Sequence, residues 1–129
     1  MSLTSQGRST SWERLFRPLR HRAVHELRVA AEHGDSGQLV SLLDPGVAVV
    51  VESGDVEHPL IRMVNGTYDA IPVLVHGLSA RPGQVVHERS VNGYAGLTLS
   101  RDNEQTAAVT IDFAGRLISS VWIRLRPRG

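Results

Sequence analysis

The sequence predicts one α+β domain, in which N-terminal helices cover a curved, mostly antiparallel sheet and form a cone. Three observations support this fold class. The first third of the chain repeats apolar residues at helical spacing, and the last third alternates apolar and polar residues between turn signals. The length of 129 residues suits one domain with a buried core. We expect a leader over residues 1–15 and a single domain over residues 16–129.

Two helices are predicted before the first strand, and a short helix or turn is expected ahead of them. This upstream segment carries Trp12, Leu15, Phe16 and Leu19 at helical spacing, but Pro18 interrupts its backbone hydrogen bonding. The first of the two helices covers residues 23–33, where apolar residues recur every three to four positions, and it ends at Gly34. Asp35 or Ser36 supplies the N-cap of the second, shorter helix. We expect this helix to end at residues 44–46, whose sequence Asp-Pro-Gly is typical of a turn.

The middle of the chain predicts a hairpin followed by a third helix. The β-branched run at residues 47–51 is typical of a buried strand, and residues 59–64 form its hairpin partner. Thr67 or Asp69 is expected to start the helix. Pro72 fits this helix only in the first turn, because proline lacks the amide hydrogen that later turns need.

The last third predicts a four-stranded antiparallel meander. Asn-Gly, Asp-Asn and Ala-Gly pairs separate strand-like runs and are suited to tight hairpin turns. Alternation gives the sheet one apolar face, which the helices must cover. The strands are expected at residues 84–91, 94–101, 105–113 and 116–126.

The composition excludes several classes of protein. The sequence contains no cysteine, so disulfides, thiol catalysis and cysteine-ligated zinc are impossible, which agrees with a cytoplasmic location. No apolar run approaches the roughly 20 residues that a membrane helix needs. The formal net charge of +1 gives no electrostatic argument for nucleic-acid binding. We expect a cytoplasmic protein that binds neither membrane nor nucleic acid directly.

The order of elements and several short phrases resemble the SnoaL-like branch of the nuclear transport factor 2-like superfamily. The phrases are Ala-Glu-His-Gly-Asp at residues 31–35, Glu-Ser-Gly-Asp at residues 52–55 and Val-Asn-Gly at residues 91–93. They are most similar to the SnoaL-like C-terminal domain of extracytoplasmic-function sigma factors. The resemblance covers roughly residues 16–127, and it implies a helix-lined cone without the promoter-binding and polymerase-binding regions of those proteins.

The resemblance implies two alternative functions. Enzymes of the superfamily use an aspartate or an aspartate and histidine pair inside the cone. On its late strands this sequence offers Asp112 alone, beside a turn where a carboxylate is usually solvated. We therefore expect a non-enzymatic ligand-binding or regulatory domain, connected with sigma-factor regulation. The alternative is a small isomerase, polyketide cyclase or hydrolase that uses an acid or base in the pocket.

Polar and aromatic residues on the predicted strands and turns are the candidate ligand contacts. An indole beside a guanidinium binds flat or anionic groups, and a histidine offers a polar handle. His21 and His25 share a helix face, but no third ligand is evident, so we expect neither metal nor cofactor. The candidates for a small hydrophobic ligand or a protein partner are His58, Arg62, His87, Asn92, Tyr94, Trp122 and Arg124.

Assembly is the last expectation from the sequence. The sheet face opposite the apolar one combines hydroxyl side chains with an indole, a mixture that suits an interface better than a helix-covered core. Trp122 lies either at the centre of that interface or at the mouth of a pocket, and we favour the interface. A homodimer is therefore expected through the face that bears Thr98, Thr110, Ser120 and Trp122.

Overall fold

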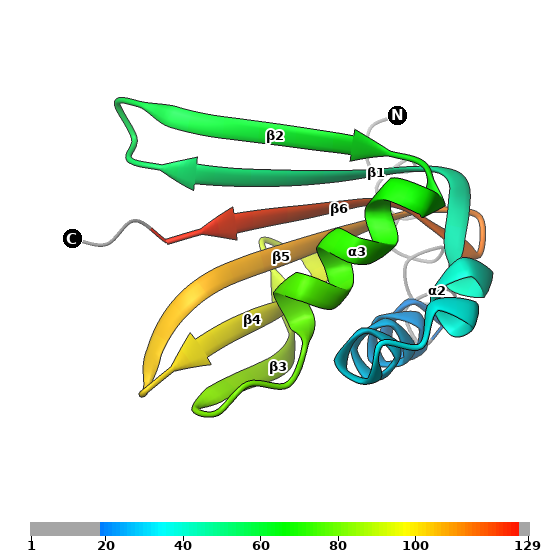
Figure 1. Ribbon diagram of the computed structural model, residues 1–129, viewed down its shortest axis with the longest axis horizontal. Helices are drawn as coiled ribbons and strands as arrows, with labels where there is room; N and C mark the ends of the chain where they lie inside the picture. The colour runs from blue at the N-terminus through cyan, green and yellow to red at the C-terminus, as the bar shows by residue number, and fades with distance from the viewer. Residues whose placement is uncertain (1–18, 127–129) are drawn as a thin grey trace, which may run out of the picture.

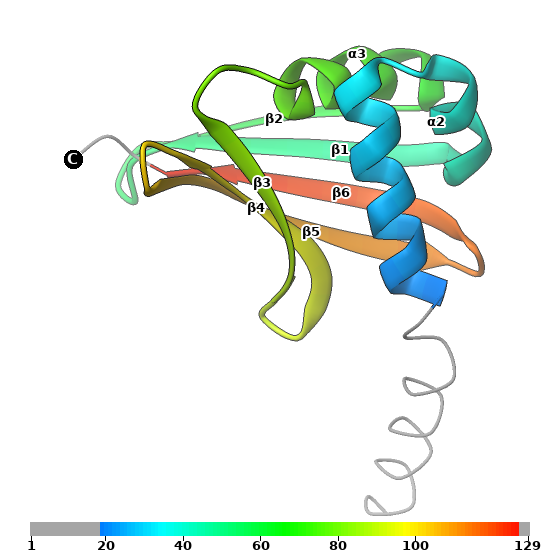
Figure 2. The same ribbon diagram turned by 90° about the horizontal axis from the view of Figure 1, so that it is seen from below.

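The computed structural model describes residues 19–126. The predicted leader and the upstream segment as far as Pro18 lie outside them. Helices cover one face of a curved six-stranded sheet, as the two views in Figures 1 and 2 show. The strand order is β2-β1-β6-β5-β4-β3. One pair of neighbours is parallel, β1 with β6, and the others are antiparallel. The predicted α+β cone with a mostly antiparallel sheet is confirmed.

The first two helices form where the spacing and the caps predict them. The N-terminal helix occupies residues 19–33 of the described chain and ends at Gly34, whose φ of 66° is one that glycine adopts without strain. The carboxylate of Asp35 accepts a hydrogen bond from the amide of Gln38 at 3.1 Å. Asp35 is therefore the N-cap of α2 (Ser36–Leu42).

The first strand starts earlier than predicted. β1 spans Leu43–Gly54 and begins directly after α2, which ends at Leu42 and not at residues 44–46, so the Asp-Pro-Gly stretch lies inside the strand. The register with β6 moves from Leu43 opposite Ile118 to Ala48 opposite Ser120, which makes this stretch a bulge. A bulge accommodates extra residues without ending the strand. The Asp-Pro-Gly sequence alone does not distinguish such a bulge from a turn that precedes the strand.

The hairpin and the third helix follow, with two corrections. β2 spans Pro59–Asn65 and α3 spans Thr67–Leu78. The helix starts at Thr67, one of the two predicted start residues, but neither Thr67 nor Asp69 is its N-cap, because that position is Gly66 and makes no side-chain hydrogen bond. Pro72 lies in the second turn rather than the first. Pro72 lacks the N–H that would bond to the carbonyl four residues earlier on the same face of the helix. Because Pro72 is exposed, that carbonyl faces solvent.

The meander is confirmed nearly residue for residue. Each strand pairs antiparallel with the next, and the turn residues Asn92, Asp102 and Asn103 have positive φ, as tight hairpin turns require. The first two strands have the predicted bounds, and the last two differ by a single residue at each end. The strands are β3 (Gln84–Val91), β4 (Tyr94–Arg101), β5 (Glu104–Ala114) and β6 (Leu117–Leu125).

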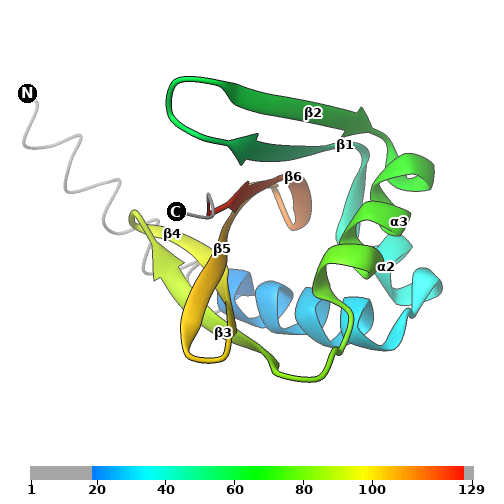
Figure 3. The ribbon, with the colours of Figure 1, turned by 60° about the vertical axis from the view of Figure 1, so that its left-hand side comes forward.

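One apolar cluster lies between the helices and the sheet. We call the sheet face that it covers the inner face, and the opposite face the outer face. Alternation along β4, β5 and β6 directs the apolar side chains inward, as predicted. The N-terminal helix, α2 and α3 complete the cluster (Figure 3). Its largest fully buried members are Leu27, Leu39, Leu43, Leu74, Leu78, Leu97, Ile111, Ile118, Val24, Val47, Val49 and Val109.

A pair of glycines tests this packing. A Cβ atom on Gly96 in β4 would collide with the carbonyl oxygen of Val109 on β5, whereas a Cβ on Gly77 in α3 meets no atom within 4 Å. We expect Gly96→Ala to lower the free energy of unfolding by about 1 to 3 kcal/mol through overpacking. Gly77→Ala should raise it by about 0.5 to 1 kcal/mol, because alanine favours the helix. Urea unfolding of both variants checks the pair, and equal effects would contradict the strand packing described here.

Candidate functional site

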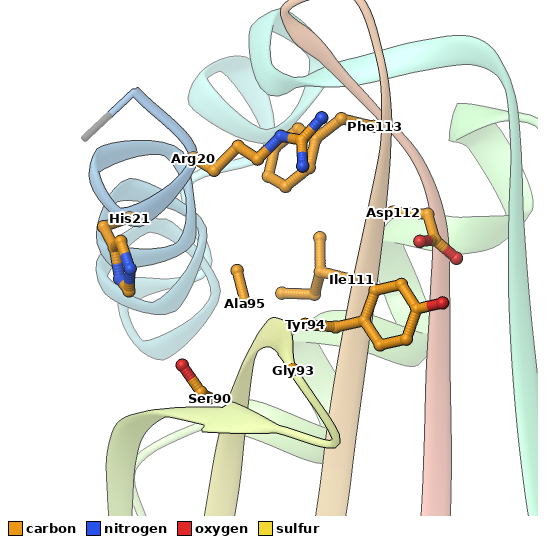
Figure 4. Close-up of a pocket in the computed structure, with 9 residues that line it drawn as sticks. All are labelled: Arg20, His21, Ser90, Gly93, Tyr94, Ala95, Ile111, Asp112 and Phe113. Carbon is orange, nitrogen blue, oxygen red and sulfur yellow. The ribbon is translucent and has the colours of Figure 1, made fainter. Parts of the chain in front are cut away.

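Hollows of similar volume lie at several places on the described chain, and we call the one where the N-terminal helix meets the edge of the sheet the main hollow. It has a volume of about 570 Å³ and is bounded by the start of the described helix, the β3–β4 turn and the end of β5 (Figure 4). The residues that line it are Arg20, His21, Ser90, Gly93, Tyr94, Ala95, Ile111, Asp112 and Phe113.

The hollow has an apolar wall, and its rim carries both a guanidinium, from Arg20, and a carboxylate, from Asp112. In Figure 4 the side chains of Ala95, Ile111 and Phe113 point toward the helix. The guanidinium carbon of Arg20 lies 5.6 Å from the centre of the Phe113 ring, a cation–π distance. An arginine held over a ring keeps several N–H donors in its own plane. The arrangement suits a small apolar molecule that carries an anionic or hydrogen-bond-accepting group.

A charged cluster fastens the N-terminal helix to β3. Oε2 of Glu88 lies 2.7 Å from Nδ1 of His25 and 2.7 Å from Nε of Arg28. Arg28 also binds Glu32 one turn further along the helix, at 2.9 Å. Because these contacts join residues far apart in sequence, they set how closely the helix approaches the sheet and so help to shape the hollow.

Two members of this cluster, Glu88 and Arg28, have shifted pKa values. Partial burial raises the pKa of Glu88, but the hydrogen bonds from His25 and Arg28 outweigh it, and the pKa lies below its ordinary range. The hydrogen bond to Glu88 raises the pKa of Arg28. The side chain of Glu88 is 31% exposed, so solvent screens the cluster and its contribution to stability is modest.

Asp112, the candidate acid or base on the late strands, does not lie in an apolar pocket. It is exposed at the rim of the hollow, and in Figure 4 its carboxylate points away from Ile111 and Phe113. It accepts a hydrogen bond from the hydroxyl of Ser120 at 3.3 Å. This is the solvated position that the neighbouring turn predicted.

Two of the predicted ligand contacts meet on the outer face. Oε2 of Glu52 accepts a hydrogen bond from the indole nitrogen of Trp122 at 3.2 Å and lies 3.2 Å from Nε of Arg124. The Arg124 guanidinium lies 5.6 Å from the centre of the Trp122 ring. Trp122 and Arg124 therefore form one group, on the face away from the helices.

The other predicted contacts lie on separate surfaces. Tyr94 lines the main hollow and His87 lines a polar one of about 200 Å³ on the outer face. Arg62 is exposed on β2, His58 is in the β1–β2 turn and Asn92 is in the β3–β4 turn. The seven candidates thus do not form one site. Within residues 19–126, no group of three metal-binding side chains is found near His21 and His25 or elsewhere.

Sequence reasoning singled out Tyr94 and Asp112 among the residues that line the main hollow, but it missed the pair of Arg20 and Phe113. The N-terminal helix includes Leu19 and Arg20, ahead of the predicted start at Ala23. Leu19 continues the spacing of Ala23 and Leu27, and this signal would have placed Arg20 on the helix. No sequence signal connects Arg20 with Phe113, because the contact depends on the angle at which the helix crosses the sheet.

Comparisons with known proteins identify the fold. The sequence matches no family profile and no curated protein. The extracytoplasmic function sigma factor SigJ of Mycobacterium tuberculosis has a TM-score of 0.60 at 21% identity, over 97% of this chain and 48% of that one. An NTF2-like protein of unknown function from Cytophaga hutchinsonii has a TM-score of 0.55 at 12% identity, over 81% and 87%. A protein from Kribbella flavida assigned as a ketosteroid isomerase has a TM-score of 0.58 at 12% identity, over 87% and 81%.

These similarities confirm the expected class at the level of the fold. The chain has the nuclear transport factor 2-like fold, and it is similar to about half of a sigma factor. The same fold occurs in proteins with unrelated activities, so the fold does not determine the function. In residues 19–126 no helix is long and apolar enough to cross a membrane.

The charged cluster is tested by Glu88→Gln. Because the pKa of Glu88 is lowered in the folded chain, its charge stabilises the fold above the pKa of the unfolded state, and this contribution disappears as the pH falls through the folded pKa. We expect the variant to lose about 1 kcal/mol near neutral pH. The difference from the wild type should shrink in acid, as measured by urea unfolding across a pH series.

Glu26→Gln is the matched control. Glu26 pairs with Arg22 on the exposed side of the same helix at 3.7 Å, and such a pair contributes little. The control should stay within about 0.5 kcal/mol of the wild type at every pH. An equal loss in both variants would show that the contact between helix and strand has no special role.

Proposed function

We propose that this protein is a non-enzymatic binding domain with a regulatory role, which takes a small apolar molecule bearing an anionic group into the main hollow. The observation that carries the proposal is the stacking of Arg20 on Phe113 above an apolar wall. A carboxylate or phosphate would meet the guanidinium, and the apolar body would rest on Ala95 and Phe113. The proposal includes the cytoplasmic location expected from the cysteine-free sequence.

The chemistry of the core supports a binding domain over an enzyme. Acid–base catalysis in such a cone needs an ionisable group whose burial tunes its pKa. Among the described residues, Thr98 is the one polar side chain that is buried, and the remaining buried side chains are hydrocarbon. The polar groups of the hollow lie at its rim, where they bind more readily than they catalyse.

The comparison with a sigma factor motivates the regulatory part of the proposal. The chain spans about half of that protein, at 48% of its length. A domain of this fold joined to a transcription factor would bind a small molecule, and binding would change the contacts between the two domains. A stand-alone domain would do the same for a separate partner.

Ligand binding in the hollow is tested by thermal shift. The probes are small aromatic and alicyclic carboxylic acids, each paired with its uncharged amide. We expect some acids to raise the melting temperature more than their amides, because binding to the folded state stabilises it. Arg20→Gln should weaken binding of those acids about tenfold, the loss expected for one charged hydrogen bond.

Arg22→Gln is the control, since Arg22 lies on the same helix with a 78% exposed side chain and does not line the hollow. It should bind the acids as the wild type does. Flat melting curves for the whole panel would refute the proposed ligand class. Equal weakening in both variants would place binding outside the hollow.

We also propose that two copies associate through their outer faces. In the register of the sheet, Val50 lies opposite Met63 on β2 and opposite Trp122 on β6, which makes an apolar row across three strands. Met63 is 61% exposed and Trp122 is 37% exposed. The hydroxyls of Thr110 and Ser120 border this row and would pair across the interface or through water.

Trp122→Glu tests the interface. The substitution places a charge at the centre of the contact and beside Glu52, so we expect the protein to become monomeric. Sedimentation at micromolar concentration measures the change. Val40→Glu is the control, because Val40 is exposed on α2, away from the sheet. A monomeric wild type, or a Trp122→Glu variant that is still dimeric, would show that the outer face is not the interface.

A further inference from the structure

One edge of the sheet is open. β2 is the last strand in the order and pairs with β1 alone among the described strands. In Figures 1 and 3 no other helix or strand of the described chain lies beside the edge of β2 that faces away from β1. α3 lies over the inner face of the sheet and not beside this edge. The backbone groups on that edge therefore have no partner strand in the described chain.

The register shows which groups these are. The amide of Gly66 donates to the carbonyl of Val47 at 2.8 Å, directly after the pair Asn65 and Ala48. Bonded and non-bonded pairs alternate along an antiparallel ladder, so the even-numbered residues of β2 bond to β1. The amides and carbonyls of Ile61 and Met63 point away from β1. Pro59, which has no amide hydrogen, falls in a non-bonded pair, as this alternation requires.

The side chains of β2 are also uncovered. Leu60 is 65% exposed and Ile61 is 59% exposed, although they lie on opposite faces of the strand. The strand is seven residues long and has a single charged residue, Arg62. A long apolar edge of this kind is a template for pairing with another strand.

The other edge of the sheet is protected by contrast. β3 carries His87, Glu88 and Arg89 in its middle, and charges on an edge discourage pairing. Glu88 is also engaged by the N-terminal helix, which packs against this side of the sheet (Figure 2). Of the two edge strands, β2 is therefore the one whose outer edge is better suited to pairing with another strand.

Arg62 defines the chemistry of the occupant. It is exposed, shares the inner face with Val51, and makes no ion pair with any described residue. We propose that the free edge of β2 binds an extended segment of another protein, which adds antiparallel to the sheet and places a carboxylate opposite Arg62. Its flanking residues would be apolar and would pack beside Ile61 and Met63.

A second copy of this chain fits the edge less well. Symmetric antiparallel pairing of two β2 strands over their whole length is centred on Arg62, because this residue is the middle of Pro59–Asn65. The two guanidinium groups would then face each other, and like charges directly opposite are destabilising. A separate segment with a carboxylate at this position removes that conflict.

Peptide binding followed by amide exchange tests the proposal. The probe is the acetylated and amidated peptide Thr-Val-Thr-Val-Asp-Val-Thr-Val-Thr, whose central aspartate faces Arg62 and whose flanking valines face Ile61 and Met63. We expect the amides of Ile61 and Met63 to exchange rapidly in the free protein and to be protected when the peptide binds. The amides of Arg62 and Val64 should be protected in both states. Binding without protection of Ile61 and Met63 would overturn the proposal, as would absence of binding at millimolar peptide.

Two matched peptides separate backbone pairing from side-chain contact. N-methylation of the two valines that flank the aspartate removes amides that face β2 in the antiparallel arrangement, and should abolish binding. N-methylation of the threonines next to them affects amides that face away, and should leave binding intact. Arg62→Glu should weaken the aspartate peptide about tenfold and strengthen a peptide with lysine in its place. Equal effects of the two methylations would overturn the proposed edge.

A substitution in the strand completes the test. Ile61→Pro removes an outward amide and keeps the ladder to β1, so it should abolish peptide binding, whereas Ile61→Thr keeps the amide and should retain it. An unchanged melting temperature for Ile61→Pro shows that the fold is intact. If the substitution lowers the melting temperature, the N-methylated peptides test the edge without changing the protein. Dimers of the free protein that Ile61→Pro dissociates and Ile61→Thr does not would assign the edge to a second copy and overturn the proposal. No residue of β2 lines the main hollow, so this result is independent of ligand binding there.

Discussion

The parallel pairing of β1 with β6 is the constraint on which the rest of the structure depends. The other strand pairs join neighbours in sequence through tight turns, whereas this pair joins the first half of the chain to the last. It joins the β1–β2 hairpin and the β3–β6 meander into one sheet, so that α3 and the first helices lie over the same inner face. It also leaves β2 at one edge and β3 at the other. The hollow, the outer face and the open edge all follow from this arrangement.

The apolar side chains that stabilise the fold and the polar groups proposed to bind partners lie in different parts of the molecule. Hydrocarbon side chains fill the space between the described helices and the sheet, and their burial stabilises the fold. Polar groups gather at the margins, where Arg20 lies over Phe113 and Glu88 joins the helix to β3. Domains of this fold that catalyse need an ionisable group inside the cone. The described part of this chain has such groups at the rim instead.

The two proposed interaction surfaces of the sheet differ in physical character. The outer face offers the apolar row through Val50 and Trp122, which a flat and largely apolar partner surface would cover. The edge of β2 offers backbone hydrogen bonds, which an extended segment satisfies and a folded surface does not. The two meet at Met63, whose side chain belongs to the row and whose backbone belongs to the edge. Occupation of one surface would therefore influence the other.

The sequence by itself determined the local elements. The alternation of β4, the turn at Asn92 and the N-cap at Asp35 depend on residues a few positions apart, and all three were predicted. Tertiary structure alone decided the parallel pairing of β1 with β6, the contact of Arg20 with Phe113 and the grouping of Glu52, Trp122 and Arg124. It also permitted Pro72 inside a helix and a bulge inside β1. These features depend on contacts between residues that are distant in sequence. The free energies of such contacts outweigh local conformational preferences, and the contacts produce no periodic pattern in the sequence.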